Sequence, residues 1–190
     1  MKEIIDIKPN NIIKKEKKDN NKINPIKYWE KDYIIEHIDK IKKPKHKVMF
    51  EFLYRTGVRL GELLEIRKKD LNFENYTINI RWLKNRKYNY RNIAMHPILA
   101  KLLTIYTSAM NLNDKLFPYN PRYVQRLTKK YFNGNPHMFR HSFAMMWIKQ
   151  DQNIVVLKEF LGHKNIQTTM KYQHILAKDQ GKSLLNINFE

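Results

Sequence analysis

Apolar residues recur every three to four positions over most of the chain, a spacing that predicts amphipathic helices. The predicted helices open at Pro25, Pro44, Arg59, Pro97, Pro121, His137, Asn153 and at Gln167 or Thr168. Gly57 is suited to end the second helix in the left-handed cap conformation, and the third helix is expected to give way near Asp70. The pattern therefore predicts a mainly helical protein.

Alternation of apolar and polar residues predicts a strand in the middle of the chain. Residues Thr77–Leu83 put Ile78, Ile80 and Trp82 on one face, which is typical of a half-buried strand. Arg91–Met95 reads as a returning strand, with a basic hairpin tip over residues 84–90. A cationic tip of this kind can reach into a groove or an active site, and a solvated turn is the alternative.

The net charge of the chain indicates what kind of partner it binds. The 190 residues include 37 Lys and Arg against 18 Asp and Glu, a formal net charge of +19. Because neutralising phosphates releases counterions, such a surplus favours a polyanionic partner, although a basic protein without enzymatic function is also compatible with it. Residues 1–24 are too polar to offset the entropy of ordering, so we expect a flexible basic arm, either merely solvated or in contact with DNA.

Some chemistries are excluded by composition. The chain has no cysteine, which removes disulfides, thiolate zinc sites and cysteine nucleophiles. Neither a membrane-length apolar run nor an apolar signal core is present, so we expect a cytoplasmic protein. The acidic residues are scattered without a paired-Asp or His-x-x-x-His motif, which weighs against a two-magnesium nuclease.

The last quarter of the chain carries residues suited to a phosphodiester. His137, Arg140 and His141 share one side of a helix, His163 follows a Leu-Gly turn, and Tyr172 comes nine residues later. Arginine donates two hydrogen bonds from a planar group that stays charged, and histidine can donate to phosphate or carry a proton. A tyrosine phenol, with an ordinary pKa near 10, can then act as the nucleophile if its proton is removed.

Three further features extend this hypothesis. Arg59 opens a helix directly after a glycine turn with Glu62 three residues on, so it can complete a two-arginine clamp, or form an ordinary surface pair. Lys84 on the hairpin is the best candidate to protonate the leaving oxygen. A cationic stripe on the helix from Pro121 can follow a phosphate backbone, or be a solvated face. Its members are Arg122, Arg126 and Lys129.

These motifs resemble the boxes of the tyrosine recombinases, the phage-integrase family. The segments are Thr56–Leu63, His137–His141, Leu161–His163 and Tyr172, and their order and spacing match over roughly residues 25–180. The resemblance implies a mainly α catalytic domain with a small three-stranded antiparallel β-sheet. It implies DNA cleavage through a covalent 3′-phosphotyrosine, with no metal, ATP or other cofactor. The implied catalytic residues are Arg59, Lys84, His137, Arg140, His163 and Tyr172, with Glu62 in support.

The resemblance also implies partners and an organisation. We expect the partner to be double-stranded DNA, with no membrane or small-molecule substrate. On DNA the chain is expected to form a homo-oligomer, a dimer or a tetramer. Its expected origin is prokaryotic, viral or a mobile element. Residues 25–180 form the expected catalytic domain, and residues 181–190 a tail that docks on a neighbouring subunit or packs on its own domain. The arm of about 24 residues is too short for the N-terminal DNA-clamping domain of full-length members.

Alternatives remain open on the sequence alone. Lys87 lies close enough in the hairpin to be the acid in place of Lys84, and otherwise it is expected to contact DNA. A type IB topoisomerase-like enzyme would use the same chemistry to nick and reseal one strand. A binding-only DNA protein would use the same basic cleft, but it has no chemical need for a tyrosine and a lysine around one phosphate.

Overall fold

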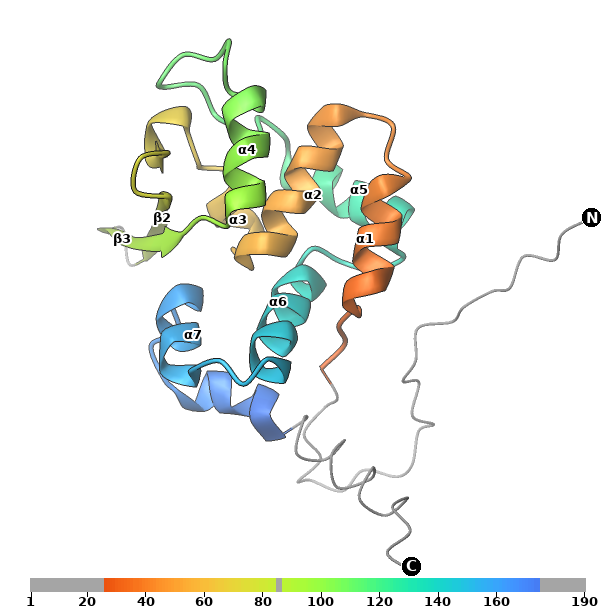
Figure 1. The fold of residues 1–190 in the computed structure, drawn as a ribbon, viewed down its shortest axis with the longest axis vertical. Helices are drawn as coiled ribbons and strands as arrows, with labels where there is room; N and C mark the ends of the chain where they lie inside the picture. The colour runs from red at the N-terminus through yellow and green to blue at the C-terminus, as the bar shows by residue number, and fades with distance from the viewer. Residues whose placement is uncertain (1–25, 85–86, 175–190) are drawn as a thin grey trace, which may run out of the picture.

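The structure, a computed structural model, describes residues 26–84 and 87–174, with the backbone alone for residues 83, 84 and 87. The labelled helices are α1 (Lys31–Asp39), α2 (Pro44–Thr56), α3 (Leu60–Leu63), α4 (Pro97–Tyr106), α5 (Pro121–Phe132), α6 (His137–Lys149) and α7 (Ile154–Leu161) (Figure 1). Residues 167–174 are helical as well. Across the described residues, every helix is too short or too polar to cross a membrane.

One antiparallel sheet, in the order β1–β2–β3, completes the fold and confirms the predicted fold class. Its strands are β1 (Leu71–Asn72), β2 (Thr77–Lys84) and β3 (Lys87–Ala94). The predicted tip over residues 84–90 is wrong, because pairing continues out to Lys84 opposite Lys87. Tyr88 and Tyr90 favour extended backbone, and the guanidinium of Arg81 lies 5.0 Å from the centre of the Tyr88 ring, which supports the added pairs.

Two predicted helix boundaries are also wrong. The first helix begins at Lys31, not Pro25, because Trp29 is held ahead of it: its backbone N–H donates to Ser142 Oγ at 2.8 Å. The third helix ends at Leu63, well before Asp70. Beyond it the carbonyl of Ile66 accepts from the backbone N–H of Leu116, so this stretch pairs with a distant segment.

Two hydrophobic clusters meet on α6. Phe139 packs in the larger one with Trp29, with Phe50 of α2 and with Phe132 of α5. One turn later the side chains of α6 enter a smaller cluster, built from α6, α7 and the last helical residues. Its buried members are Phe143, Ala144, Met145, Ile148, Leu157, Leu161 and Tyr172. Since α6 belongs to both clusters, it fixes the C-terminal part of the chain against the N-terminal part.

Gly57 allows the closest approach between α2 and α6. It ends α2 with φ +59°, as the sequence predicted, and a Cβ atom at this position would lie 2.8 Å from the ring of Phe143. A side chain would therefore meet both backbone strain and a collision with α6. Because Arg59 follows two residues later, this contact sets its distance from the residues of α6.

We expect Gly57→Ala to destabilise the fold by about 2–4 kcal/mol, the sum of a left-handed backbone penalty and overpacking. Gly61→Ala is the matched control, because it is a helical glycine with nothing within 4 Å of an added Cβ. We expect it to be neutral or stabilising by up to about 1 kcal/mol. Urea unfolding followed by tryptophan fluorescence compares the two, and equal midpoints would contradict the proposed contact.

Candidate active site

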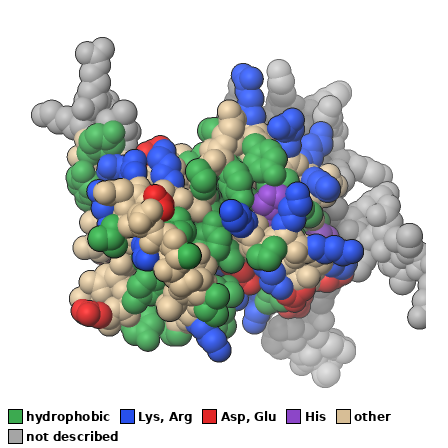
Figure 2. All heavy atoms as spheres, turned by 90° about the horizontal axis from the view of Figure 1, so that it is seen from above, with side chains coloured by type: hydrophobic (Ala, Val, Ile, Leu, Met, Phe, Trp, Pro, Cys, Tyr) green, Lys and Arg blue, Asp and Glu red, His purple; other side chains and the backbone are tan. Residues whose placement is uncertain are grey.

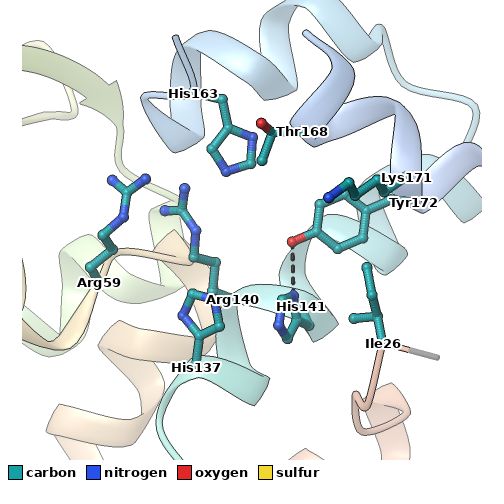
Figure 3. Close-up of a pocket in the computed structure, with 9 residues that line it drawn as sticks. All are labelled: Ile26, Arg59, His137, Arg140, His141, His163, Thr168, Lys171 and Tyr172. Carbon is teal, nitrogen blue, oxygen red and sulfur yellow. Dashed lines mark hydrogen bonds between the residues drawn. The ribbon is translucent and has the colours of Figure 1, made fainter. Parts of the chain in front are cut away.

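A pocket of about 540 Å³ opens where α3, α6 and the C-terminal helical residues meet (Figure 3). Its lining residues are Ile26, Arg59, His137, Arg140, His141, His163, Thr168, Lys171 and Tyr172. Five of the six residues predicted to be catalytic are among them. The sixth, Lys84, has a described backbone at the end of β2, while its side chain and that of Lys87 lie outside the described atoms.

Arg140 is the most enclosed cation of the pocket, with a side chain only 1% exposed. One terminal nitrogen donates to the carbonyl of Gly57 at 3.0 Å and the other to the carbonyl of Leu161 at 2.7 Å. Burial, with Arg59 nearby, lowers the pKa of Arg140 to about 10, so the group keeps its charge at neutral pH. Two of its five N–H groups are used in these bonds, which leaves donors for a bound anion.

Arg59 is held by a buried carboxylate. Its backbone N–H donates to Glu62 at 2.8 Å and its guanidinium donates to the same side chain at 3.0 Å. Glu62 is only 3% exposed and also accepts two hydrogen bonds, each 2.9 Å long, from Arg91 of β3. Burial alone would raise the pKa of Glu62, but the bonds and charge of Arg91, with those of Arg59, hold it below its usual range. The carboxylate is therefore ionised and orients Arg59.

His163 is placed by a turn and by a threonine. Asn153 caps α7 by accepting from the backbone N–H of Val155, as predicted. Gly162 ends the helix with φ +66°. Nδ1 of His163 then lies 2.8 Å from the hydroxyl of Thr169, which is fully buried. Burial and the neighbouring arginines lower the pKa of His163 to about 4, so its ring is neutral at pH 7.

His137 and His141 lie one turn apart on α6, with ring centres 4.5 Å apart. Burial, with Arg140 and Arg59 nearby, lowers the pKa of His137. Burial, with His137 and Arg140, lowers the pKa of His141 to about 4. The arginines thus disfavour a positive charge on these histidines, and an anion in the pocket would counteract that effect.

Tyr172 points its hydroxyl into the same space (Figure 3). Its side chain is only 3% exposed, and the hydroxyl lies 2.8 Å from Nδ1 of His141. Burial raises the pKa of Tyr172, although Arg140 and Arg59 act in the opposite direction. The phenol therefore carries its proton at neutral pH, and it can attack only if a neighbouring group accepts that proton.

The stripe predicted to contact DNA lies elsewhere. Arg122, Arg126 and Lys129 are exposed on α5, which does not line the pocket. On the face drawn in Figure 2, lysine and arginine side chains gather around a histidine. The stripe and the pocket are thus separate cationic features of the described residues.

Three residues that structure the pocket were not predicted as site residues. His141 shares its helix side with His137 and Arg140, and that spacing was a signal for it. Arg91 is a charged residue on the same face of β3 as buried Ile93, which is a signal for a buried ion pair. Thr169 has no comparable signal in the sequence. Among the described residues, no group of three or more His, Asp or Glu side chains is arranged to hold a metal ion.

The fold and the pocket together define a class: mainly helical domains that present a tyrosine beside paired arginines. Residues 30–179 match the model of the Phage integrase family, and the chain belongs to that family. It is 36% identical over 143 residues to a tyrosine recombinase XerA of Saccharolobus solfataricus, an alignment that covers 73% of this chain and 48% of that protein. The chain thus spans about half the length of this curated relative.

Solved structures agree on the fold. The crystal structure of a XerA recombinase superposes with a TM-score of 0.70 at 22% identity, covering 90% of this chain and 68% of the other. A pre-cleavage complex of the XerH site-specific recombinase bound to its difH substrate has a TM-score of 0.63, also at 22% identity, and covers 80% and 51%. At these identities the agreement concerns the fold alone.

Proposed function

We propose that this chain is a site-specific DNA recombinase that cleaves and rejoins DNA strands through a covalent 3′-phosphotyrosine. The observation that carries the proposal is the pocket itself, where the guanidinium groups of Arg59 and Arg140 and the hydroxyl of Tyr172 face one cavity. Membership of the family and the net charge of +19 support DNA as the substrate.

The proposed mechanism follows from the residues. Arg59 and Arg140 hold the nonbridging oxygens of the scissile phosphate and stabilise the charge that builds on them during attack. His163 and His137 donate further hydrogen bonds to those oxygens. Tyr172 attacks phosphorus and the bond to the 5′ oxygen breaks, with Lys84 as the proposed proton donor to that oxygen. Attack by the 5′ hydroxyl of another strand then releases Tyr172, so the bond energy is conserved.

We assign residues 25–180 to the catalytic domain and the surface stripe on α5 to phosphate contacts. Glu62 supports the site by orienting Arg59, through the bonds described above. The chain assembles as a dimer or a tetramer on DNA. Sedimentation with a saturating duplex tests the assembly, because a species that remains a monomer on each duplex would contradict it.

A covalent-trapping experiment tests the function. The protein is incubated in EDTA with duplexes that carry a randomised central region and a nick. Because of the nick, cleavage releases a short strand that diffuses away and cannot rejoin. Covalent species are isolated under denaturing conditions and their DNA is sequenced. We expect a trapped product with a defined cleavage site. DNA that binds under native conditions but never survives denaturation would instead indicate a binding-only protein, and relaxation of supercoils without exchange between two sites would indicate a topoisomerase.

A further inference from the structure

Among the three histidines of the pocket, His141 is the one in hydrogen-bond contact with Tyr172. Its Nδ1 lies 2.8 Å from the phenol oxygen, within the range of a good proton-transfer contact. Nδ1 of His163 is engaged with Thr169 instead. His137 contacts the ring of His141 edge to face, on the side toward Arg140 (Figure 3). Each of the three histidines therefore has a different contact in the pocket, and only that of His141 is to the phenol.

We propose that His141 is the catalytic base of this site, taking the proton of Tyr172 during attack and returning it during rejoining. The proposal rests on the proposed function and adds a residue and a role to it. In cleavage the phenol O–H bond breaks, its proton passes to Nδ1 of His141, and the phenol oxygen forms its bond to phosphorus. In rejoining the phosphorus–phenol bond breaks, and the imidazolium returns the proton to the phenol oxygen.

The resting charges suit this transfer. With its pKa lowered by burial, His141 is a neutral imidazole, so it can offer a lone pair to the phenol proton. The charged and titratable groups around it are His137 and Arg140 on α6, Tyr172 and Lys171 on the last helix, and Arg59 and His163 across the pocket. Before DNA binds, the arginines oppose a further positive charge on the ring.

A bound phosphate offsets the effect of the arginines on the His141 ring. Its negative charge pairs with Arg59 and Arg140, so the net positive charge felt by the imidazole falls and its basicity rises. Binding of the substrate thus makes His141 basic enough to accept the proton. Until a phosphodiester is in place, Tyr172 stays protonated. A simple docking contact between α6 and the last helix would use the same hydrogen bond without moving a proton, and experiment can separate the two roles.

The test compares rates of covalent trapping on the duplex recovered in the trapping experiment. His141→Asn keeps a hydrogen-bonding atom near the position of Nδ1 but cannot accept a proton at neutral pH. We expect its rate to fall about 10²–10⁴-fold, the usual contribution of a general base. His96→Asn is the matched control, since His96 is an exposed N-cap of α4 and asparagine is a preferred N-cap. We expect it to retain the native rate.

A second variant separates a base from a docking contact. A fluorinated tyrosine at position 172 has a lower pKa than tyrosine, so it loses its proton more readily and depends less on a base. We expect it to accelerate the His141→Asn protein by at least tenfold more than it accelerates the native one. An unchanged rate in His141→Asn, or a slow rate that fluorination fails to improve, would overturn the proposal. A native protein that forms no adduct would overturn the proposed function instead, and with it this inference.

Discussion

Tyr172→Phe protein will form no covalent species with nicked DNA, a loss of at least about a thousandfold, while it still folds and binds the duplex. The substitution removes one oxygen, the atom that faces Arg59 and Arg140 across the pocket. The ring remains and fills the same position in the smaller hydrophobic cluster. Folding changes only by the lost hydrogen bond to His141, about 1 kcal/mol.

The measurement is the fraction of labelled DNA retained on protein under denaturing conditions, in EDTA. Tyr76→Phe is the control, because it removes the same atom from a half-exposed tyrosine outside the pocket. Native binding of the duplex, measured by gel shift, should be equal in both variants. If Tyr172→Phe formed an adduct at the native rate, another nucleophile would be required and the assignment of Tyr172 would be wrong.

Local sequence pattern was sufficient for much of the framework. Gly57 and Gly162 adopt the positive φ angles of helix ends, and Asn153 caps α7, because these positions depend on nearby backbone alone. The side shared by His137 and Arg140 followed from helical periodicity. Local pattern could not bring Arg59 near Arg140, because 81 positions separate them in the sequence; the resemblance to a family supplied that expectation.

Long-range contacts account for the features that local sequence pattern does not predict. The third helix ends early because Ile66 pairs with a segment fifty residues later, and no pattern within the helix encodes that partner. The hairpin is longer than predicted because the basic residues between its aromatic ones suggested a loop, although cross-strand contacts make the same stretch extended. His141 was visible as a neighbour of Arg140, but its contact with Tyr172 arises only when two helices meet.

Arg140→Ala is expected to lower both stability and the rate of covalent trapping, because this side chain has a structural role and a chemical role. Its guanidinium is the group that joins the carbonyl of Gly57, after α2, to the carbonyl of Leu161, at the end of α7. Truncation leaves both carbonyls without that donor in a buried site, which should cost about 2–4 kcal/mol of stability. It also removes a charge from the phosphate clamp, and we expect covalent trapping to slow by about 10³-fold or more.

Arg140→Lys separates the two effects. Lysine keeps the positive charge, but a single ammonium cannot reach two carbonyls and a phosphate with the geometry of a planar guanidinium. We therefore expect a rate loss of at least about 10²-fold with partial recovery of stability. Arg55→Lys is the control, since Arg55 pairs with Glu51 on α2, away from the pocket lining. A slow Arg140→Lys protein with native stability would assign the arginine to the phosphate, whereas a native rate would show that charge alone suffices there and that the planar clamp is not needed.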